Sequence, residues 1–453
     1  MSDRTTTSCS GFTRSEAIRM GAARAGDGLP AIEPGMPTPA GTGLTRRGLL
    51  LRGAGMAVSV YGASKLGVDA LEEGVARAAA TPAGRVLVSI YLPGGIDGMS
   101  VLAPTGDPRY ATLRPTLKVT SGTAHSVDRG LTWAPAASAL ATLDGEGKVA
   151  AAPAIGYTGA DQSHFTSRHF WETGDVGFSS SYGWLGRYLD QHGDDGNPLQ
   201  GLSLSGSLSP ALAAAEVPVA AVADPFDLGL WTPGMWGDAL PPFYDALADL
   251  GALPTSDPQL RTVRVAAAQA EGVRRQLSGM AGATPATSSY PAGDYGRRLS
   301  ALAGLIDDDL PLRCVTVDAP GGYDTHDNQA AALPGLLKQT CDGILAFQRD
   351  LEARGIADRV LVLVWSEFGR RPQQNQTGTD HGAAGVGFVV GKQVRPGLLG
   401  EFPGLATLDA TDNLRSTIDF RSVYCGVLEE WFGVDAGPLV PGAAGFARPS
   451  LLA

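Results

Sequence analysis

The chain has 453 residues, of which 43% are hydrophobic and 18% are charged, and its formal net charge is −11. This length can supply a large core and two or three domains of average size. The acidic balance excludes charge-driven binding to nucleic acid or to an anionic membrane, because a phosphate backbone needs a basic protein face. A small molecule or a neutral polymer is the partner that this composition favours.

The first eighty residues lack the pattern of a folded domain and resemble an export leader. Thr45-Arg46-Arg47, followed by Gly-Leu-Leu-Leu, resembles a twin-arginine signal. The apolar stretch at 53–61 is too short to span a membrane, and the three alanines at 78–80 offer a cleavage site. We therefore expect residues 1–80 to be removed or disordered and the protein to be exported by the twin-arginine machinery to the periplasm, the cell surface or the medium. The alternative is a basic tail with no targeting role.

Apolar runs of strand length predict a mostly parallel central sheet in residues 81–453. They occupy residues 85–92, 149–155, 202–204, 217–222, 313–318, 360–365 and 386–390. Helices are predicted at 132–143, 182–192, 241–250, 259–280, 293–309, 330–354 and 420–432. We expect one α/β domain with a helical insertion at about 240–310 and loops around Trp231 and Trp236.

The four cysteines of the chain give no sign of a disulfide or of a metal site with thiolate ligands. Cys9 lies in the leader, and Cys314, Cys341 and Cys425 show no Cys-x-x-Cys spacing. Their apolar surroundings predict buried thiols.

Acidic residues follow three of the predicted strands. Asp97 follows a glycine turn after residues 85–92, Asp324 follows 313–318, and Glu367 follows 360–365 directly. Ligands of open parallel sheets bind outside the carboxyl ends of the strands, so these side chains are expected to converge. Carboxylates held together must protonate, pair with cations or bind metal.

Histidines accompany these carboxylates. His326 lies two residues after Asp324, and the pair Asp380-His381 precedes the strand at 386–390. With no cysteine nearby, we expect oxygen and nitrogen ligands for a divalent metal, zinc first, with manganese, magnesium or calcium as alternatives.

A serine and a histidine open the helix that follows the strand at 149–155. Free backbone N–H groups at the start of a helix can stabilise an ionised hydroxyl, so Ser163 is a candidate nucleophile with His164 beside it. The alternative is that Ser163 caps the helix and His164 packs.

Together these segments resemble an exported bacterial family, domain of unknown function 1501, which is similar to the alkaline phosphatase and sulfatase superfamily. The resemblance rests on Tyr91-Leu-Pro-Gly-Gly-Ile-Asp-Gly, Gln162-Ser-His-Phe, Gly321-Gly-Tyr-Asp-Thr-His, Ser366-Glu-Phe-Gly-Arg and Gly378-Thr-Asp-His-Gly. It implies a three-layer α/β/α sandwich of alkaline-phosphatase type, with metals at the strand ends and a serine or threonine nucleophile at a helix start.

Carried over residue by residue, the resemblance implies two metal positions. It makes Ser163 the nucleophile, Asp97 a ligand from the first strand, Asp324 and His326 ligands of one metal, and Asp380 and His381 ligands of the other. Glu367 becomes a further ligand or a base, and Arg370 a contact for the anionic substrate.

The sequence also departs from these relatives. It has no histidine after His381, and no cysteine lies in the Cys-x-Pro/Ala-x-Arg context of classical sulfatases, which argues against that activity. We therefore expect an exported, metal-dependent hydrolase of phosphate or sulfate esters that acts on a small-molecule or polymer substrate. The alternative is a secreted binding or assembly protein with a structural metal.

Overall fold

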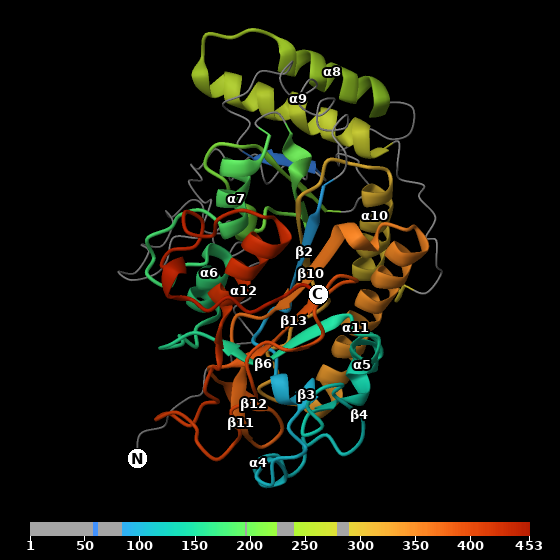
Figure 1. Ribbon diagram of the computed structural model, residues 1–453. Coiled ribbons are helices and arrows are strands. Elements are labelled where there is room, and N and C mark those ends of the chain that lie inside the picture. Colours follow the sequence, from blue (N-terminus) through green and yellow to red (C-terminus); the bar gives the residue numbers. More distant parts are fainter. Residues whose placement is uncertain (1–57, 62–83, 195–196, 224–239, 279–289) are drawn as a thin grey trace, which may run out of the picture. The chain divides into compact units, whose positions relative to one another are not determined.

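A ten-stranded, mostly parallel sheet runs through the part of the chain that the structure describes (Figure 1). The computed structural model describes residues 58–61, 84–194, 197–223, 240–278 and 290–453, which all belong to the unit Pro39–Ala453. The twin-arginine motif, the alanines at 78–80 and the loops around Trp231 and Trp236 lie outside these residues. No helix among the described residues is long and apolar enough to cross a membrane.

Five neighbouring strands form the parallel part of the sheet. In spatial order they are β8 (Val219–Val222), β7 (Gly201–Leu204), β9 (Cys314–Asp318), β2 (Val86–Tyr91) and β10 (Val360–Trp365). On the β8 side, β1 (Val58–Tyr61) pairs antiparallel with β8 and forms the edge of the sheet. The prediction that the apolar segments of these five strands belong to one sheet is thus confirmed.

On the other side of the sheet, one strand runs against its neighbours. Here β13 (Gly385–Val390) pairs antiparallel with β10 and with β6 (Val149–Gly156), while β14 (Gly397–Leu398) and β15 (Ile418–Asp419) pair with β6. The chain reaches β13 from β10 through the hairpin of β11 (Arg370–Gln374) and β12 (Thr379–His381). Without a crossover helix, the chain returns in the opposite direction.

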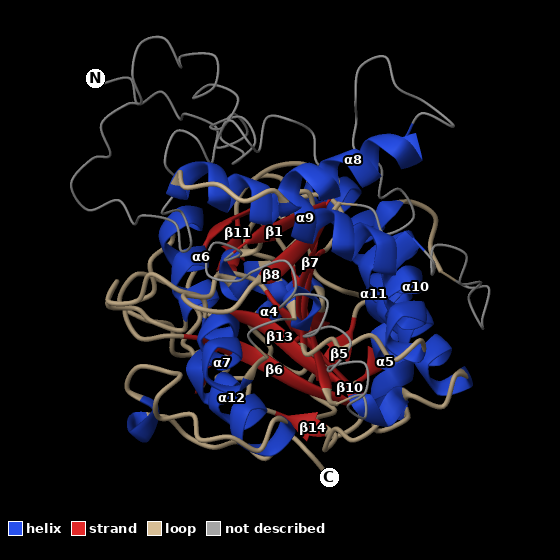
Figure 2. Ribbon diagram, turned by 90° about the horizontal axis from the view of Figure 1, so that it is seen from above, coloured by secondary structure: helices blue, strands red, loops and turns tan. Residues whose placement is uncertain are grey.

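Helices cover both faces of the sheet, as the view in Figure 2 shows. One face packs against α5 (Ser138–Gly145), α10 (Asp294–Asp307) and α11 (Gln329–Ala353). The other packs against α6 (His164–Thr173), α7 (Trp184–His192) and α12 (Phe420–Gly426), which continues as a π-helical turn, Val427–Trp431. Alternation along β2 divides its side chains between the two cores. The predicted three-layer α/β/α arrangement is confirmed.

Three more helices and a small second sheet lie in the described part. They are α4 (Tyr110–Leu113), α8 (Leu240–Ala252), α9 (Pro258–Ser278) and a three-stranded sheet of β3 (Leu102–Ala103), β5 (Thr132–Trp133) and β4 (Thr123–Ala124). The helix predicted at 132–143 was wrong at its start, because residues 132–133 form β5. Ala134, held extended before Pro135, keeps the helix from starting earlier. The three cysteines are free and buried, as predicted.

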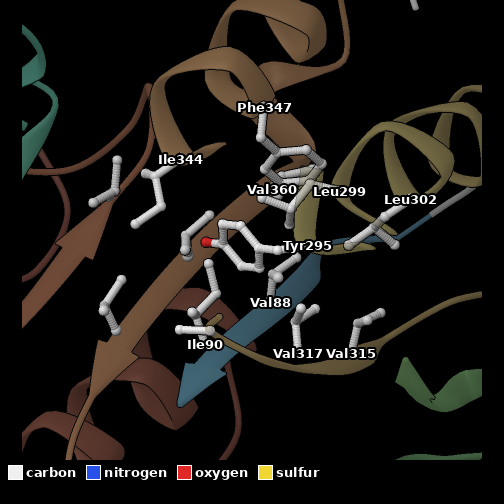
Figure 3. Close-up of a cluster of buried hydrophobic side chains, with 14 of the residues drawn as sticks. Val88, Ile90, Tyr295, Leu299, Leu302, Val315, Val317, Ile344, Phe347 and Val360 are labelled. Carbon is white, nitrogen blue, oxygen red and sulfur yellow. The ribbon is translucent and has the colours of Figure 1, made fainter. Parts of the chain in front are cut away.

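One glycine of α11 makes room for a large core side chain. The ring of Tyr295 lies among side chains of β2 and α11 (Figure 3), and it is 3% exposed. A Cβ placed on Gly343 would come within 2.5 Å of this ring. The close approach of α10 and α11 therefore depends on the absence of a side chain at position 343.

Replacing Gly343 by alanine is expected to lower the free energy of unfolding by about 1–3 kcal/mol, because the ring must move within a close-packed core. Gly335→Ala is the matched control, since a Cβ on Gly335 of the same helix meets nothing within 4 Å. That control is expected to stabilise the protein by up to about 1 kcal/mol through helix propensity. Urea unfolding of both variants measures the difference, and equal effects would contradict the packing argument.

Candidate metal site

The topology brings four segments together at the carboxyl ends of the parallel strands. The carboxyl ends of β9, β2 and β10 are neighbours because these strands are parallel. β6 runs in the same direction and leads to His164 at the start of α6, where Ser167 Oγ donates a hydrogen bond to the carbonyl of Glu367 at 2.6 Å. The β11–β12 hairpin brings His381 back to this edge before β13 begins.

Asp324 is the centre of the resulting cluster. Its carboxylate oxygens lie 3.4 Å from His164 Nε2, 3.1 Å from His326 Nε2 and 3.3 Å from His381 Nε2. His326 Nε2 and His381 Nε2 are 3.0 Å apart. Three of the six histidines in the chain therefore direct the same ring nitrogen towards one carboxylate.

The second nitrogen of each ring has an oxygen partner that can only accept. His164 Nδ1 donates to Glu367 Oε1 at 2.7 Å, and His381 Nδ1 donates to the carbonyl of Gln162 at 2.8 Å. His326 Nδ1 faces Asp380 Oδ1 at 3.3 Å. A neutral imidazole with its proton on Nδ1 has a lone pair on Nε2. In their neutral forms, all three rings present lone pairs to the same small volume.

Lone pairs that converge in this way fit a cation better than they fit one another. His164, Asp324 and His381 each offer a ligand atom, and these atoms all lie within 4.8 Å of one another. Two ligands of a tetrahedral zinc ion are about 3.4 Å apart. His164 Nε2 is moreover buried and has only the 3.4 Å ion-pair contact with Asp324, with no well-formed hydrogen bond among the described residues, a condition that a metal bond would relieve. The residues present therefore fit a divalent metal.

The close contacts within the cluster also shift the pKa values of its members. Burial opposes the charge on Asp324, but its contacts with the histidines and Arg370 hold the pKa of this carboxyl well below its usual range. Burial disfavours the His164 imidazolium, yet the contacts with Asp324 and Glu367 raise the pKa of His164 to about 9. Burial and nearby positive charge lower the pKa of His381. In the metal-free protein, a proton on His164 thus occupies the place of a cation, and metal binding must release it.

Glu367 supports His164 and is not part of the ligand group. Its carboxylate is 1% exposed, accepts a hydrogen bond from the Gly94 N–H at 2.9 Å, and lies 3.0 Å from the Ser366 hydroxyl. Burial raises the pKa of Glu367. The hydrogen bond and the charge of His164 lower this pKa by more than burial raises it, so the pKa lies below its ordinary value. An ionised Glu367 keeps the His164 proton on Nδ1.

Arg370 is already fully engaged, which corrects the expectation that it contacts an anionic substrate. Its side chain is 0% exposed and donates to Asp324 Oδ1 at 2.5 Å. Its other nitrogens donate to the carbonyls of Gly95 at 2.6 Å and Thr379 at 2.9 Å. Arg370 therefore fixes Asp324 and the glycine turn after β2.

Asp97 does not join the cluster, although it follows a strand as predicted. Arg114 donates to both of its carboxylate oxygens, at 2.5 and 3.0 Å, and both side chains are almost completely buried. Ser100 and Gln329 donate to the same carboxylate. The lone pairs that a metal would need are used in this ion pair. Sequence reasoning missed Arg114, because nothing in its local pattern identifies its partner.

Ser163 lies next to His164 but acts as the cap of α6. Its side chain accepts a hydrogen bond from the Thr166 N–H at 3.5 Å. Within the described part of the chain, no hydrogen bond joins its hydroxyl to Asp324 or to the three imidazoles. Asp380 Oδ1 lies 3.3 Å from His326 Nδ1, outside the group of His164, Asp324 and His381.

Residues 264–440 match the family "Protein of unknown function (DUF1501)". The DUF1501 match includes Asp324, His326 and the β10–β13 segment, so the resemblance read from the motifs is confirmed for this part of the chain. No curated protein matches.

Among solved structures, the chain is similar to the crystal structure of PsFucS1 sulfatase from Pseudoalteromonas sp. The identity is 10% and the TM-score 0.30, over 82% of this chain and 72% of that chain. So distant a likeness supports no inference about function.

Proposed function

We propose that the protein is an exported, metal-dependent hydrolase of phosphate or sulfate esters. One observation carries the proposal: the ligand atoms of His164, Asp324 and His381 converge at the carboxyl ends of the strands, on side chains that are partly exposed. The side chains of His164 and Asp324 are 26% and 27% exposed. Catalytic zinc sites typically combine three protein ligands with one open position.

The proposed roles follow from these positions. A divalent cation, zinc first because two ligands are imidazoles, would stabilise negative charge on the ester oxygens. Ser163 is the proposed nucleophile, because it opens a ten-residue helix whose free N–H groups stabilise an ionised hydroxyl. Glu367 orients His164, and Arg370 orients Asp324. The substrate is a small-molecule or polymer ester, and export relies on the motif at Thr45–Arg47.

The test combines metal analysis with turnover assays. Purified protein, loaded in turn with zinc, manganese, magnesium and calcium, is assayed on an aryl phosphate, a phosphodiester and an aryl sulfate. Ser163→Asn keeps a helix-capping side chain but has no hydroxyl, so it should fold normally and lose turnover. Ser163→Ala also loses the cap, which separates the two effects. Full activity in the asparagine variant would reject Ser163 as the nucleophile.

A second function is favoured by two contacts. The Ser163 hydroxyl is used in a helix cap, and Asp97 is used in an ion pair. A secreted binding or assembly protein with a structural metal would show this arrangement without turnover. For that function, a chelator should lower the melting temperature, and no ester should be cleaved with any of the four metals.

A further inference from the structure

We infer that His326 is a displaceable group beside the metal site, and that His164, Asp324 and His381 are the permanent ligands. This inference rests on the proposed metal site and adds to it the residue that covers its open position. Four protein groups surround the site, and a site closed by four protein ligands would have no room for a substrate. Which of the four can leave therefore decides between a catalytic and a structural centre.

His326 and His164 compete for the position next to Asp324 and His381. His326 Nε2 approaches both of these residues closely, at 3.1 and 3.0 Å. His164 Nε2 also belongs to a group with Asp324 and His381 whose ligand atoms all lie within 4.8 Å of one another, but that group does not take in His326 as a fourth member. Ligands of one zinc ion lie no more than about 4.3 Å apart. All four groups therefore cannot bind one ion unless a ring moves.

The carboxylates that anchor the two rings, Glu367 for His164 and Asp380 for His326, differ in their burial and in their distance from the ring nitrogen. His164 Nδ1 is held at 2.7 Å by Glu367, whose side chain is 1% exposed. His326 Nδ1 lies 3.3 Å from Asp380, whose side chain is 58% exposed. A charge-assisted hydrogen bond is usually about 2.7–2.9 Å long, and water competes with an exposed one. The His326 ring is thus the weakly held one, and it is also the more exposed.

The backbone of His326 is fixed, so that movement is confined to its side chain. Asn375 Nδ2 donates to the carbonyl of His326 at 2.9 Å, and the Thr379 N–H donates to the carbonyl of Thr325 at 3.1 Å. The neighbouring Thr325 is buried, with its hydroxyl 3.0 Å from Gln329 Oε1. Rotation of the ring alone would uncover one side of the site without disturbing β9 or α11.

Metal binding by single-histidine variants tests this assignment. Zinc affinity and stoichiometry are measured by competition with a chromophoric chelator for the full chain, His326→Ala, His381→Ala and the remote control His192→Ala. We expect His326→Ala to keep one zinc per chain with an affinity within about tenfold of the parent, no more than the lower end of the 10–100-fold loss that removal of an indirect contact causes. His381→Ala should lose more than about 100-fold. Equal losses in the two variants would overturn the inference.

A second measurement guards against misfolding of His381→Ala. The visible spectrum of the cobalt-loaded protein reports the ligand set directly, and it should be the same in the parent and in His326→Ala. A changed spectrum in His326→Ala would identify His326 as a ligand and overturn the inference. A parent protein that binds zinc but cleaves no ester would defeat the proposed function alone, whereas one that binds no metal would defeat both.

Discussion

Replacing Arg114 by methionine is expected to lower the free energy of unfolding by about 3–5 kcal/mol, the cost of leaving a buried carboxylate without its partner. The Arg114 guanidinium is 0% exposed and binds both oxygens of Asp97. It also donates to the carbonyls of Pro372 at 2.5 Å and Arg371 at 2.9 Å. Methionine fills part of the volume but satisfies none of these acceptors.

The control for this prediction removes both charges. Asp97→Leu combined with Arg114→Met should be more stable than Arg114→Met alone, because no buried carboxylate remains unpaired. Urea unfolding at pH 7 measures each variant, and a loss below about 1 kcal/mol in Arg114→Met would contradict the argument. Asp97→Asn should still bind metal, because Asp97 lies outside the ligand group.

The pH dependence of the same pair has a defined sign. Burial raises the pKa of Asp97. The charge and hydrogen bonds of Arg114 lower this pKa by more than burial raises it, so the pKa in the folded protein is below its ordinary value. The stabilisation is present above the ordinary aspartate pKa of about 3.9 and is lost as the pH falls through the lowered folded value. The difference in stability between the parent and Asp97→Asn should therefore shrink in acid.

The position of the site could be predicted from the sequence because it depends on the backbone. Buried apolar strands followed by Asp324 and Glu367 indicate one edge of a parallel sheet, and the structure confirms this edge. The direction of β13 was less accessible, because a strand pattern does not state its orientation. The hairpin from β11 to β12 determines that direction, and it also brings His381 to the same edge.

The role of each charged residue could not be predicted, because it depends on side chains far apart in the sequence. Asp97 and Asp324 both follow strands, but only Asp97 meets a buried arginine that neutralises it. Arg370 looks like a free cation in sequence, whereas in the fold it binds carbonyls of the turn after β2. His164 gains its place in the ligand group from Glu367, more than two hundred residues later.

Glu367→Gln is expected to weaken zinc binding about 10–100-fold, which corresponds to about 1.4–2.7 kcal/mol. Glutamine keeps the shape of the side chain but has only one acceptor oxygen. Glu367 Oε1 accepts from both His164 Nδ1 and the Gly94 N–H, and Oε2 faces the Ser366 hydroxyl. An amide nitrogen turned towards His164 would force the ring proton onto Nε2, where the metal must bind.

Asp380→Asn is the matched control, since it makes the same chemical change at the anchor of His326. Because this anchor is exposed and lies 3.3 Å from the ring, its loss should change zinc affinity by less than about threefold. Competition titrations of both variants at the same pH give the comparison. Equal losses would mean that the two anchors orient equivalent ligands, and a loss only in Asp380→Asn would exchange the roles of His164 and His326. A loss only in Glu367→Gln follows if the buried carboxylate fixes a permanent ligand while the exposed one restrains a ring that can leave.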